Sequence, residues 1–219
     1  MYLTPQVAGN AELTLGGIDC TKFTGRLPFK SCPFKIESIP LGTPQYASLA
    51  SRSSAWTLTS PGLSVNGKTN SILTQSRDII FDSGTSNVLF STDTAEVWKA
   101  DICSISHAHV HSQAIYALIS PDIKPNPSEP GTYGISCDRI SSLPAVIDIT
   151  FTSQNGEPFN LTIPSSELSV GPFANDPSTC QTLINAFDGL ELVGGSLLKH
   201  WYSIWDIQNQ RLGFAQAKF

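Results

Sequence analysis

The residues with the clearest chemical potential lie in the segment RDIIFDSGTSNVLF, residues 77–90. Its centre is an acidic turn, Asp82-Ser83-Gly84, which stands between two apolar runs. These apolar flanks predict that the turn is buried, and a buried carboxylate is costly unless it is hydrogen-bonded or has a function. The tripeptide alone is typical of many ordinary turns, so its meaning depends on the rest of the chain.

A second informative element lies far downstream, in LELVGGSLLKHWYSIWDIQNQRLGFA, residues 190–215. It contains an apolar-apolar-glycine unit, Leu192-Val193-Gly194, followed by a short helical pattern and a strand pair. The chain therefore combines one candidate catalytic carboxylate, Asp82, with a distant glycine-containing strand.

The elements that must position these residues are mainly strands. Short segments rich in β-branched or aromatic residues, broken by Gly, Pro or Asn, predict strands at residues 11–18, 26–32, 54–67, 77–82, 145–153, 159–164 and 202–216. The segment 148–163 reads as a hairpin that turns at Asn155-Gly156, and 206–214 reads as a tighter one.

Helical patterns are few. Three segments show one: 91–103, 195–203 and 178–186. In the first, Asp93 is a candidate N-cap and Glu96 follows three residues later, as in a capping box. The segment 120–131 is a proline-rich loop. Since no linker or repeat is visible, we expect one all-β domain over residues 1–219, mostly β with short helices on its edges.

The composition excludes several classes of function. Only 14% of the residues are charged and the net charge is −5, whereas nucleic-acid binding needs a basic patch. No apolar stretch approaches the roughly 18 residues of a membrane helix. Residues 1–17 lack a charged start followed by an apolar run, so we expect no signal peptide.

The cysteines and one sequon favour an oxidising compartment. Five cysteines are widely spaced, at positions 20, 32, 103, 137 and 180. This spacing does not suit a zinc site, but it is compatible with disulfides and one remaining thiol. The sequence Asn160-Leu161-Thr162 is an acceptor for N-glycosylation, although a sequon inside a strand can stay unused.

The whole combination resembles the C-terminal lobe of the pepsin-like aspartic endopeptidases. In that family each lobe has an apolar-apolar-Asp-Thr/Ser-Gly-Ser/Thr loop and a later apolar-apolar-Gly strand that crosses it in a psi-shaped core; residues 80–85 and 192–194 match these. The segments ELTLGGIDCTKFTGRLPF, YGISCDRISSLPAVIDITF, FNLTIPSSEL and WYSIWDIQNQRLGFA follow in the family's order. The resemblance implies one lobe of the bilobal acid protease fold, with a psi-loop core.

The resemblance also implies acid hydrolysis of peptide bonds in polypeptide substrates, with no cofactor and no metal. Two adjacent carboxylates share one proton, so the charged one can take a proton from water while the neutral one polarises the substrate carbonyl. Asp82 would be this lobe's catalytic carboxylate. Ser83 would join the lattice that links the two catalytic loops, and Gly84 would point its N–H at the carboxylate. The Thr85 hydroxyl would bond the outer carboxylate oxygen, with Ser86 further out.

The remaining polar residues receive plainer interpretations. By resemblance, Cys137 pairs with Cys180, and the location is secreted or vacuolar. Cys20 and Cys32 could bridge the first hairpin, which would leave Cys103 as the free thiol. Three alternating histidines could share one face of a strand and bind a metal, but we interpret them as a surface segment: His107, His109 and His111. A cluster of aromatic residues suggests core packing more than a sugar platform: Trp201, Tyr202 and Trp205.

The chain departs from the family in one decisive respect. It has no second Asp-Thr-Gly or Asp-Ser-Gly, because Asp188-Gly189 lacks the preceding apolar pair. Gly195 also replaces the aspartate that often follows the crossing glycine, a change that retains Gly194 itself. The chain therefore encodes half of a dyad, and a lone Asp82 has no shared proton and no reason for an altered pKa.

Three interpretations follow from this half dyad. The chain is part of a two-lobed endopeptidase whose N-terminal lobe lies on missing sequence; or two copies pair and each supplies Asp82; or the scaffold is a non-catalytic inhibitor or binding protein. The retained residues 82–85 count against the last. We expect the isolated chain to be a monomer without acid protease activity.

Overall fold

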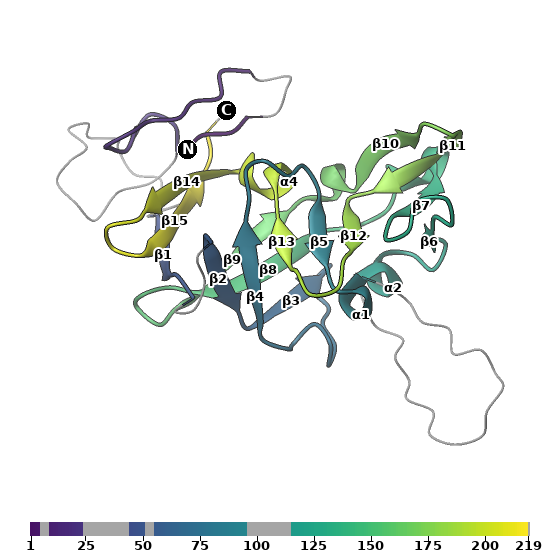
Figure 1. The fold of residues 1–219 in the computed structure, drawn as a ribbon, viewed down its shortest axis with the longest axis horizontal. Helices are drawn as coiled ribbons and strands as arrows, with labels where there is room; N and C mark the ends of the chain where they lie inside the picture. The colour runs from purple at the N-terminus through teal and green to yellow at the C-terminus, as the bar shows by residue number, and fades with distance from the viewer. Residues whose placement is uncertain (5–8, 24–43, 51–54, 96–114, 219) are drawn as a thin grey trace.

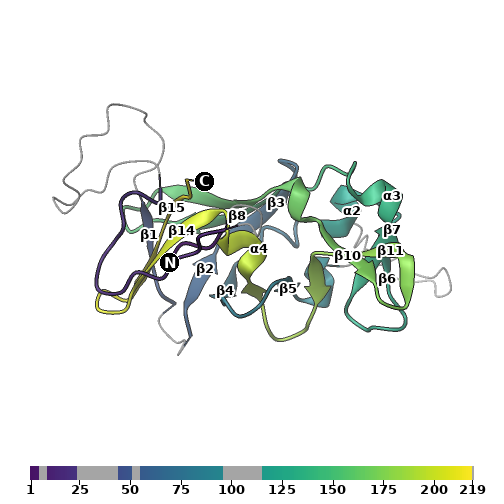
Figure 2. The same cartoon turned by 90° about the horizontal axis from the view of Figure 1, so that it is seen from above.

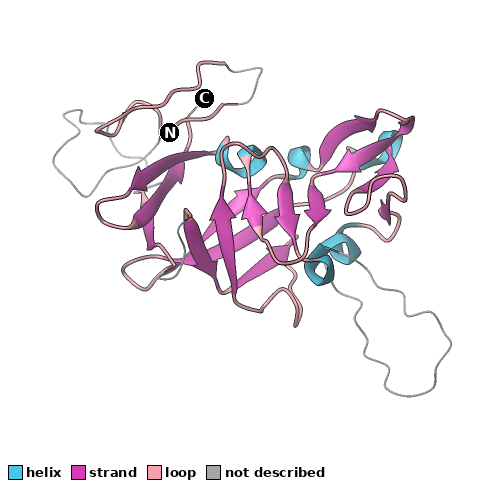
Figure 3. Cartoon of the chain, in the orientation of Figure 1, coloured by secondary structure: helices cyan, strands magenta, loops and turns pink. Residues whose placement is uncertain are grey.

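The structure, a computed structural model, describes residues 1–4, 9–23, 44–50, 55–95 and 115–218. Strands are the main regular element of the described chain, and the helices are single short turns (Figure 3). The prediction of an all-β fold with short helices is therefore confirmed.

The central sheet holds the two elements singled out in the sequence. Its five strands are β2 Thr57–Ser60, β4 Arg77–Phe81, β5 Val88–Phe90, β12 Ile184–Ala186 and β13 Leu192–Val193. They lie in the order β12-β5-β13-β4-β2 (Figure 1). In β4, Ile79 and Phe81 are buried while their neighbours are less so, as expected when side chains alternate between the faces of a strand.

A second sheet packs against the first. Its strands are β3 Gly62–Val65, β8 Ile147–Thr152 and β9 Pro158–Ile163, in the order β3-β8-β9. The hairpin expected over 148–163 is confirmed by the pairing of β8 with β9, and Gly156 adopts a φ of 85° at its turn. The rings of Phe81 and Phe151 lie 5.6 Å apart between the two sheets, and Figure 2 shows the two layers from above.

A third sheet closes one end of the molecule. Its strands are β1 Gln45–Ser48, β14 Trp201–Asp206 and β15 Arg211–Gln216, in the order β1-β15-β14. The predicted hairpin over 206–214 is confirmed. Tyr202 is buried, and Trp201 and Trp205 pack against the main core, so these aromatic rings are core residues. Both chain ends lie near this sheet (Figure 1).

The fourth sheet lies at the opposite end. Its strands are β6 Lys124–Pro125, β7 Tyr133–Ser136, β10 Ser169–Phe173 and β11 Asp176–Thr182, in the order β10-β11-β7-β6. A disulfide joins Cys137 to Cys180, which confirms the pairing that the family resemblance implied. Cys20 is disulfide-bonded as well. Cys32 and Cys103 lie outside the described residues, so the pairing of Cys20 with Cys32 stays a prediction.

The helices differ most from the predicted segments. The described ones are α1 Thr92–Ala95, α2 Ile115–Ile119, α3 Cys137–Ile140, the 3-10 turn η1 Ser165–Glu167 and α4 Gly195–Leu198. The helix expected over 178–186 is wrong, because β11 and β12 pair there with β7 and β5. The helix expected over 195–203 is too long, because Trp201 already begins β14. None of the helices in the described residues is long and apolar enough to cross a membrane.

The predicted elements near the N-terminus and around α1 are confirmed only in part. No strand forms over 11–18, where Glu12 makes only an isolated bridge with Tyr2. The helix expected over 91–103 does begin at Thr92, but everything after Ala95 lies outside the described residues, as does the strand expected over 26–32. Asp93 lies in the first turn of α1 and is not its cap; the Thr92 N–H is instead bound by a distant carboxylate, Asp188.

Candidate functional site

The strands around Asp82 cross in the psi-shaped pattern that the resemblance implied. Strand β13 lies between β4 and β5, so the two strands that flank the acidic loop do not pair with each other. It runs parallel to β4, with Val193 opposite Phe81, and antiparallel to β5, with Val193 opposite Val88. The loop of residues 82–87 therefore spans the end of β13 (Figure 1).

Backbone contacts then bind this loop to the segment that follows β13. The Asp82 N–H donates to the Val193 carbonyl at 3.1 Å, and the Gly195 N–H donates to the Thr85 carbonyl at 2.7 Å. A Cβ on Gly194 would lie only 2.0 Å from the Thr85 carbonyl oxygen, so only glycine fits at this approach. The Ser196 N–H adds a contact of 3.2 Å to the loop carbonyl next to Thr85. The crossing segment thus fixes the backbone on which Asp82 sits.

Two neighbours in the loop bind the carboxylate of Asp82. The Gly84 N–H donates to Oδ1 at 2.9 Å, and the Thr85 hydroxyl donates to Oδ2 at 2.6 Å. The Thr85 hydroxyl, and to a lesser degree the Gly84 N–H, lower the pKa of Asp82 below its ordinary value, against a small opposing effect of burial. The expectation of an unaltered pKa is therefore wrong, because the loop stabilises the charged form without a second carboxylate.

The loop itself is more exposed than its apolar flanks suggested. Phe81 and Val88 are buried, and Phe81 packs against the ring of Phe214 at 5.1 Å. Asp82 is only half-buried, and three of its followers are exposed: Ser83, Gly84 and Ser86. The prediction of a buried turn is wrong because the apolar side chains enter the core while the loop emerges where the strands end. An open carboxylate can reach water or a substrate.

The other acidic turn lies elsewhere. The Asp188 carboxylate accepts the Thr92 N–H at 2.8 Å, and the neighbouring Phe187 N–H donates to the Phe90 carbonyl at 2.8 Å. Because Phe90 ends β5 while Asp82 precedes that strand, Asp188 lies at the opposite end of β5. It serves the start of α1 and does not approach Asp82.

Other candidate residues have plain surroundings. Asn160 is exposed on β9, where its side-chain oxygen accepts the Thr150 hydroxyl at 2.9 Å. The histidines proposed for a surface segment lie outside the described residues. Within the residues that the structure describes, no three or more His, Cys, Asp or Glu side chains form a group that could hold a metal ion.

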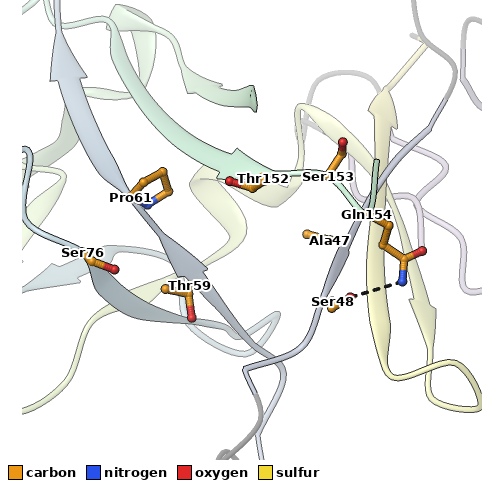
Figure 4. A pocket seen from close by; sticks show the side chains of 8 residues that line it. All are labelled: Ala47, Ser48, Thr59, Pro61, Ser76, Thr152, Ser153 and Gln154. Carbon is orange, nitrogen blue, oxygen red and sulfur yellow. Dashed lines mark hydrogen bonds between the residues drawn. The ribbon is translucent and has the colours of Figure 1, made fainter. Parts of the chain in front are cut away.

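One cavity of about 430 Å³ opens between β1, β2 and the turn of the β8–β9 hairpin (Figure 4). Its polar lining is uncharged and includes Ser48, Thr59, Ser76, Thr152 and Gln154. Gln154 is fixed there by a bond of 3.2 Å from its side-chain amide to the Ser48 hydroxyl. Thr59 pairs with Asp78 of β4. Asp78 lies roughly 13 Å along the strand from Asp82, at a rise of about 3.3 Å per residue. The cavity offers no group for acid–base chemistry.

Sequence reasoning missed two charged residues near the crossing strand. Arg77 is the first residue of β4 and Glu191 directly precedes β13, and their side chains form an ion pair of 3.6 Å. Each lies within two residues of an apolar run, but nothing in the sequence singles out these two positions or joins them.

Comparison with known proteins gives a consistent result. The family model described as eukaryotic aspartyl protease matches residues 1–217. Vacuolar protease A of Aspergillus fumigatus is 23% identical over 98% of this chain and 43% of its own length. The aspartic protease of Phaffia rhodozyma is 29% identical over 95% of the chain and 41% of its own length. Pepsin-2B of Gadus morhua is 26% identical over 99% of the chain and 52% of its own length. The chain spans about half the length of the curated relatives it matches.

Proposed function

This chain belongs to the eukaryotic aspartyl protease family, and from that premise we propose that Asp82 is one of the two carboxylates of an aspartic endopeptidase site. The observation that carries the proposal is the state of this carboxylate. It is open to solvent, and the Thr85 hydroxyl and the Gly84 N–H hold it in the charged form on a loop that Gly194 locks in place.

The proposed reaction is the hydrolysis of peptide bonds by an activated water molecule. A charged carboxylate accepts a proton from the water as it attacks, and a neutral carboxyl group donates a hydrogen bond to the substrate carbonyl. Asp82 fits the first role because the donors around it favour its charged form. In this proposal Gly84 and Thr85 orient the carboxylate, while Ser83 and Ser86 are exposed and so accessible to a second catalytic loop.

The second carboxylate has to come from outside residues 1–219, which we propose form a single lobe. The relatives are about twice as long as this chain, which supports a second lobe on the same polypeptide. Pairing of two copies, each with its own Asp82, is the alternative source. Polypeptides are the proposed substrates. The disulfide and the names of the vacuolar and pepsin relatives support a vacuolar or secreted location.

The test compares the chain with the longer polypeptide read from the gene upstream of Met1. Acid cleavage of an unfolded protein substrate is measured for both, with Asp82→Asn as the variant and Asp188→Asn as a matched control that also removes one carboxylate. We expect no cleavage by the chain alone, cleavage by the longer polypeptide, and loss of that cleavage with Asp82→Asn only.

Two outcomes would overturn parts of this proposal. Cleavage by the longer polypeptide that survives Asp82→Asn would remove the catalytic role of Asp82. Cleavage by the chain alone that depends on Asp82 and rises with the square of its concentration would identify a site built from two copies.

A further inference from the structure

A cluster of polar side chains lies at the end of the central sheet opposite Asp82. At its centre the Arg77 guanidinium faces the Glu191 carboxylate, with 3.6 Å between Nη1 and Oε1. Their side chains are only 7% and 15% exposed. Glu191 Oε2 is buried and has no hydrogen-bond partner among the described residues. A charge pair in such a place costs desolvation energy that the mutual attraction repays only in part.

The guanidinium is held by contacts from several segments. Its Nη1 donates to the Thr94 hydroxyl at 3.0 Å and its Nη2 donates to the Ile72 carbonyl at 2.6 Å. The Ser91 hydroxyl lies 2.9 Å from that of Thr94 and donates to Glu191 at 3.4 Å. The cluster therefore joins the start of β4, the residue before β13 and the residue after β5, which are the three strands of the crossing, to helix α1.

Glu191 stands at the first step of the β4–β13 pairing. Its carbonyl accepts the Ile80 N–H at 2.9 Å, directly before Leu192 pairs with Ile80. The side chain that reaches Arg77 and the backbone that meets β4 thus belong to one residue. Whatever fixes the Glu191 side chain also fixes where β13 begins.

The sequence of β13 does not set its own register. The strand has two residues, and both Leu192 and Val193 are buried, so burial does not distinguish one face from the other. Register is weakly specified where the two faces of a strand are alike. Gly194 must pass the Thr85 carbonyl, yet Gly195 also lacks a Cβ, so a slip that brings Gly195 into the place of Gly194 would meet no steric barrier there.

We propose that Arg77 and Glu191 are positioning residues, whose ion pair sets the register of β13 and so holds the Asp82 loop against Gly194. The pair contributes specificity of pairing more than net stability, a use that is attested for buried ionic groups elsewhere. Its relevance to catalysis rests on the proposed function, but the structural claim does not, because the register can be measured without any substrate.

The test uses three variants of the chain. Arg77→Met with Glu191→Leu replaces the pair by apolar side chains of similar size; Arg77→Met alone leaves Glu191 uncompensated; Arg139→Met is the matched control. Arg139 pairs with Asp122 at 2.7 Å, but both are about half exposed, so its loss removes a surface ion pair only.

Three readouts separate positioning from stability. Thermal melting reports the global fold. Amide hydrogen exchange of Gly195 and Ser196, which bind the Asp82 loop, is compared with that of core amides in the β8–β9 hairpin. Carbon NMR follows the titration of the Asp82 carboxyl. We expect the double variant to melt within a few degrees of the wild type, with exchange at Gly195 and Ser196 faster by about tenfold or more while hairpin exchange stays unchanged. The single variant should melt lower, and the control should match the wild type.

Unchanged exchange at Gly195 in a stably folded double variant would overturn the proposal and leave the pair a merely structural feature. If the double variant does not fold, Arg77→Lys decides instead, since it keeps the charge and loses the planar contacts to Thr94 and Ile72. The proposal then requires faster exchange at Gly195 than in the wild type, with the β8–β9 amides still protected; equal exchange refutes it. Loss of proteolysis with Asp82→Asn tests the proposed function separately, so either idea can fail without the other.

Discussion

Replacing Gly194 by alanine tests the crossing-strand geometry most directly. A Cβ at this position would lie 2.0 Å from the Thr85 carbonyl oxygen and 2.8 Å from that of Asn87, whereas ordinary contacts begin near 3.4 Å. The backbone angles of Gly194, φ −110° and ψ −153°, are open to any residue, so the cost is steric and not conformational. To make room, the Thr85 carbonyl would have to retreat by about 1.4 Å.

The magnitude follows from what has to move. Overpacking costs about 1–3 kcal/mol, and more where the surroundings are rigid. Here the obstructing atoms are backbone atoms, and the retreat also breaks the bond of 2.7 Å from the Gly195 N–H to the Thr85 carbonyl. We therefore expect Gly194→Ala to lower the free energy of unfolding by about 3 kcal/mol or more. For a chain of this length that corresponds to a fall in Tm of about 6–12 °C.

The neighbouring glycine provides the control. A Cβ on Gly195 would lie 3.7 Å from the Thr85 carbonyl oxygen, an ordinary contact, and Gly195 begins α4, where alanine is well tolerated. We expect Gly195→Ala to melt within about 2 °C of the wild type. The measurement is thermal unfolding followed by circular dichroism. If Gly194→Ala and Gly195→Ala melt alike, β13 does not pass the Asp82 loop in the way described.

Three further predictions concern single groups. Thr85→Val removes the stronger donor to Asp82, so the pKa of Asp82 should rise toward its ordinary value by NMR titration. A lowered pKa gives stability that is present above the unfolded-state pKa and is lost as the pH falls through the folded-state pKa. The curve of unfolding free energy against pH should therefore be flatter at its acid end in this variant, and an unchanged curve would contradict the role of Thr85. Replacing Cys137 and Cys180 by serine opens a loop with a sequence separation of 43 and should cost about 4 kcal/mol by urea unfolding. Tyr116→Phe removes a buried hydroxyl that binds backbone groups at 2.6 and 3.0 Å and should cost about 2 kcal/mol by the same assay; a loss under 0.5 kcal/mol would contradict it.

The sequence predicted the strands of the two hairpins well, because hairpins depend on neighbours in the chain, but the strand expected over 11–18 does not form and strands such as β7 and β10 were not predicted. The hairpin at Asn155-Gly156 needs only turn residues and alternating apolar positions, and it forms as expected. The bonds from Gly84 and Thr85 to Asp82 were implied by the family resemblance, and both form within one loop.

The errors arise where distant segments decide the local structure. Residues 178–186 have a weak helical pattern, but pairing with β7 and β5 makes them strands. The start of α1 is bound by Asp188 and not by Asp93, a choice that only the folded chain brings about. The ion pair of Arg77 with Glu191 spans more than a hundred positions and has no local signature. Exposure of the Asp82 loop was missed because apolar flanks indicate where the strands go, not where they end.

The lowered pKa of Asp82 has a consequence for the source of the second carboxylate. In the lone chain, the loop donors favour the charged form of Asp82. A second carboxyl group nearby would oppose this, because two adjacent carboxyl groups cannot both ionise without strong repulsion, and the two apparent pKa values would then belong to the pair.

If the partner came from a second copy, the same donors would act on both carboxylates, and the shared proton would have no preferred side. If it came from a different lobe, any difference in donors would place the charge on the better-bound carboxylate. Asp82, with one hydroxyl and one backbone donor, would then be the base unless its partner were bound equally well. In the assembled protein, identical titration curves for the two carboxyl groups would therefore indicate two copies, and two distinct curves would indicate a different lobe.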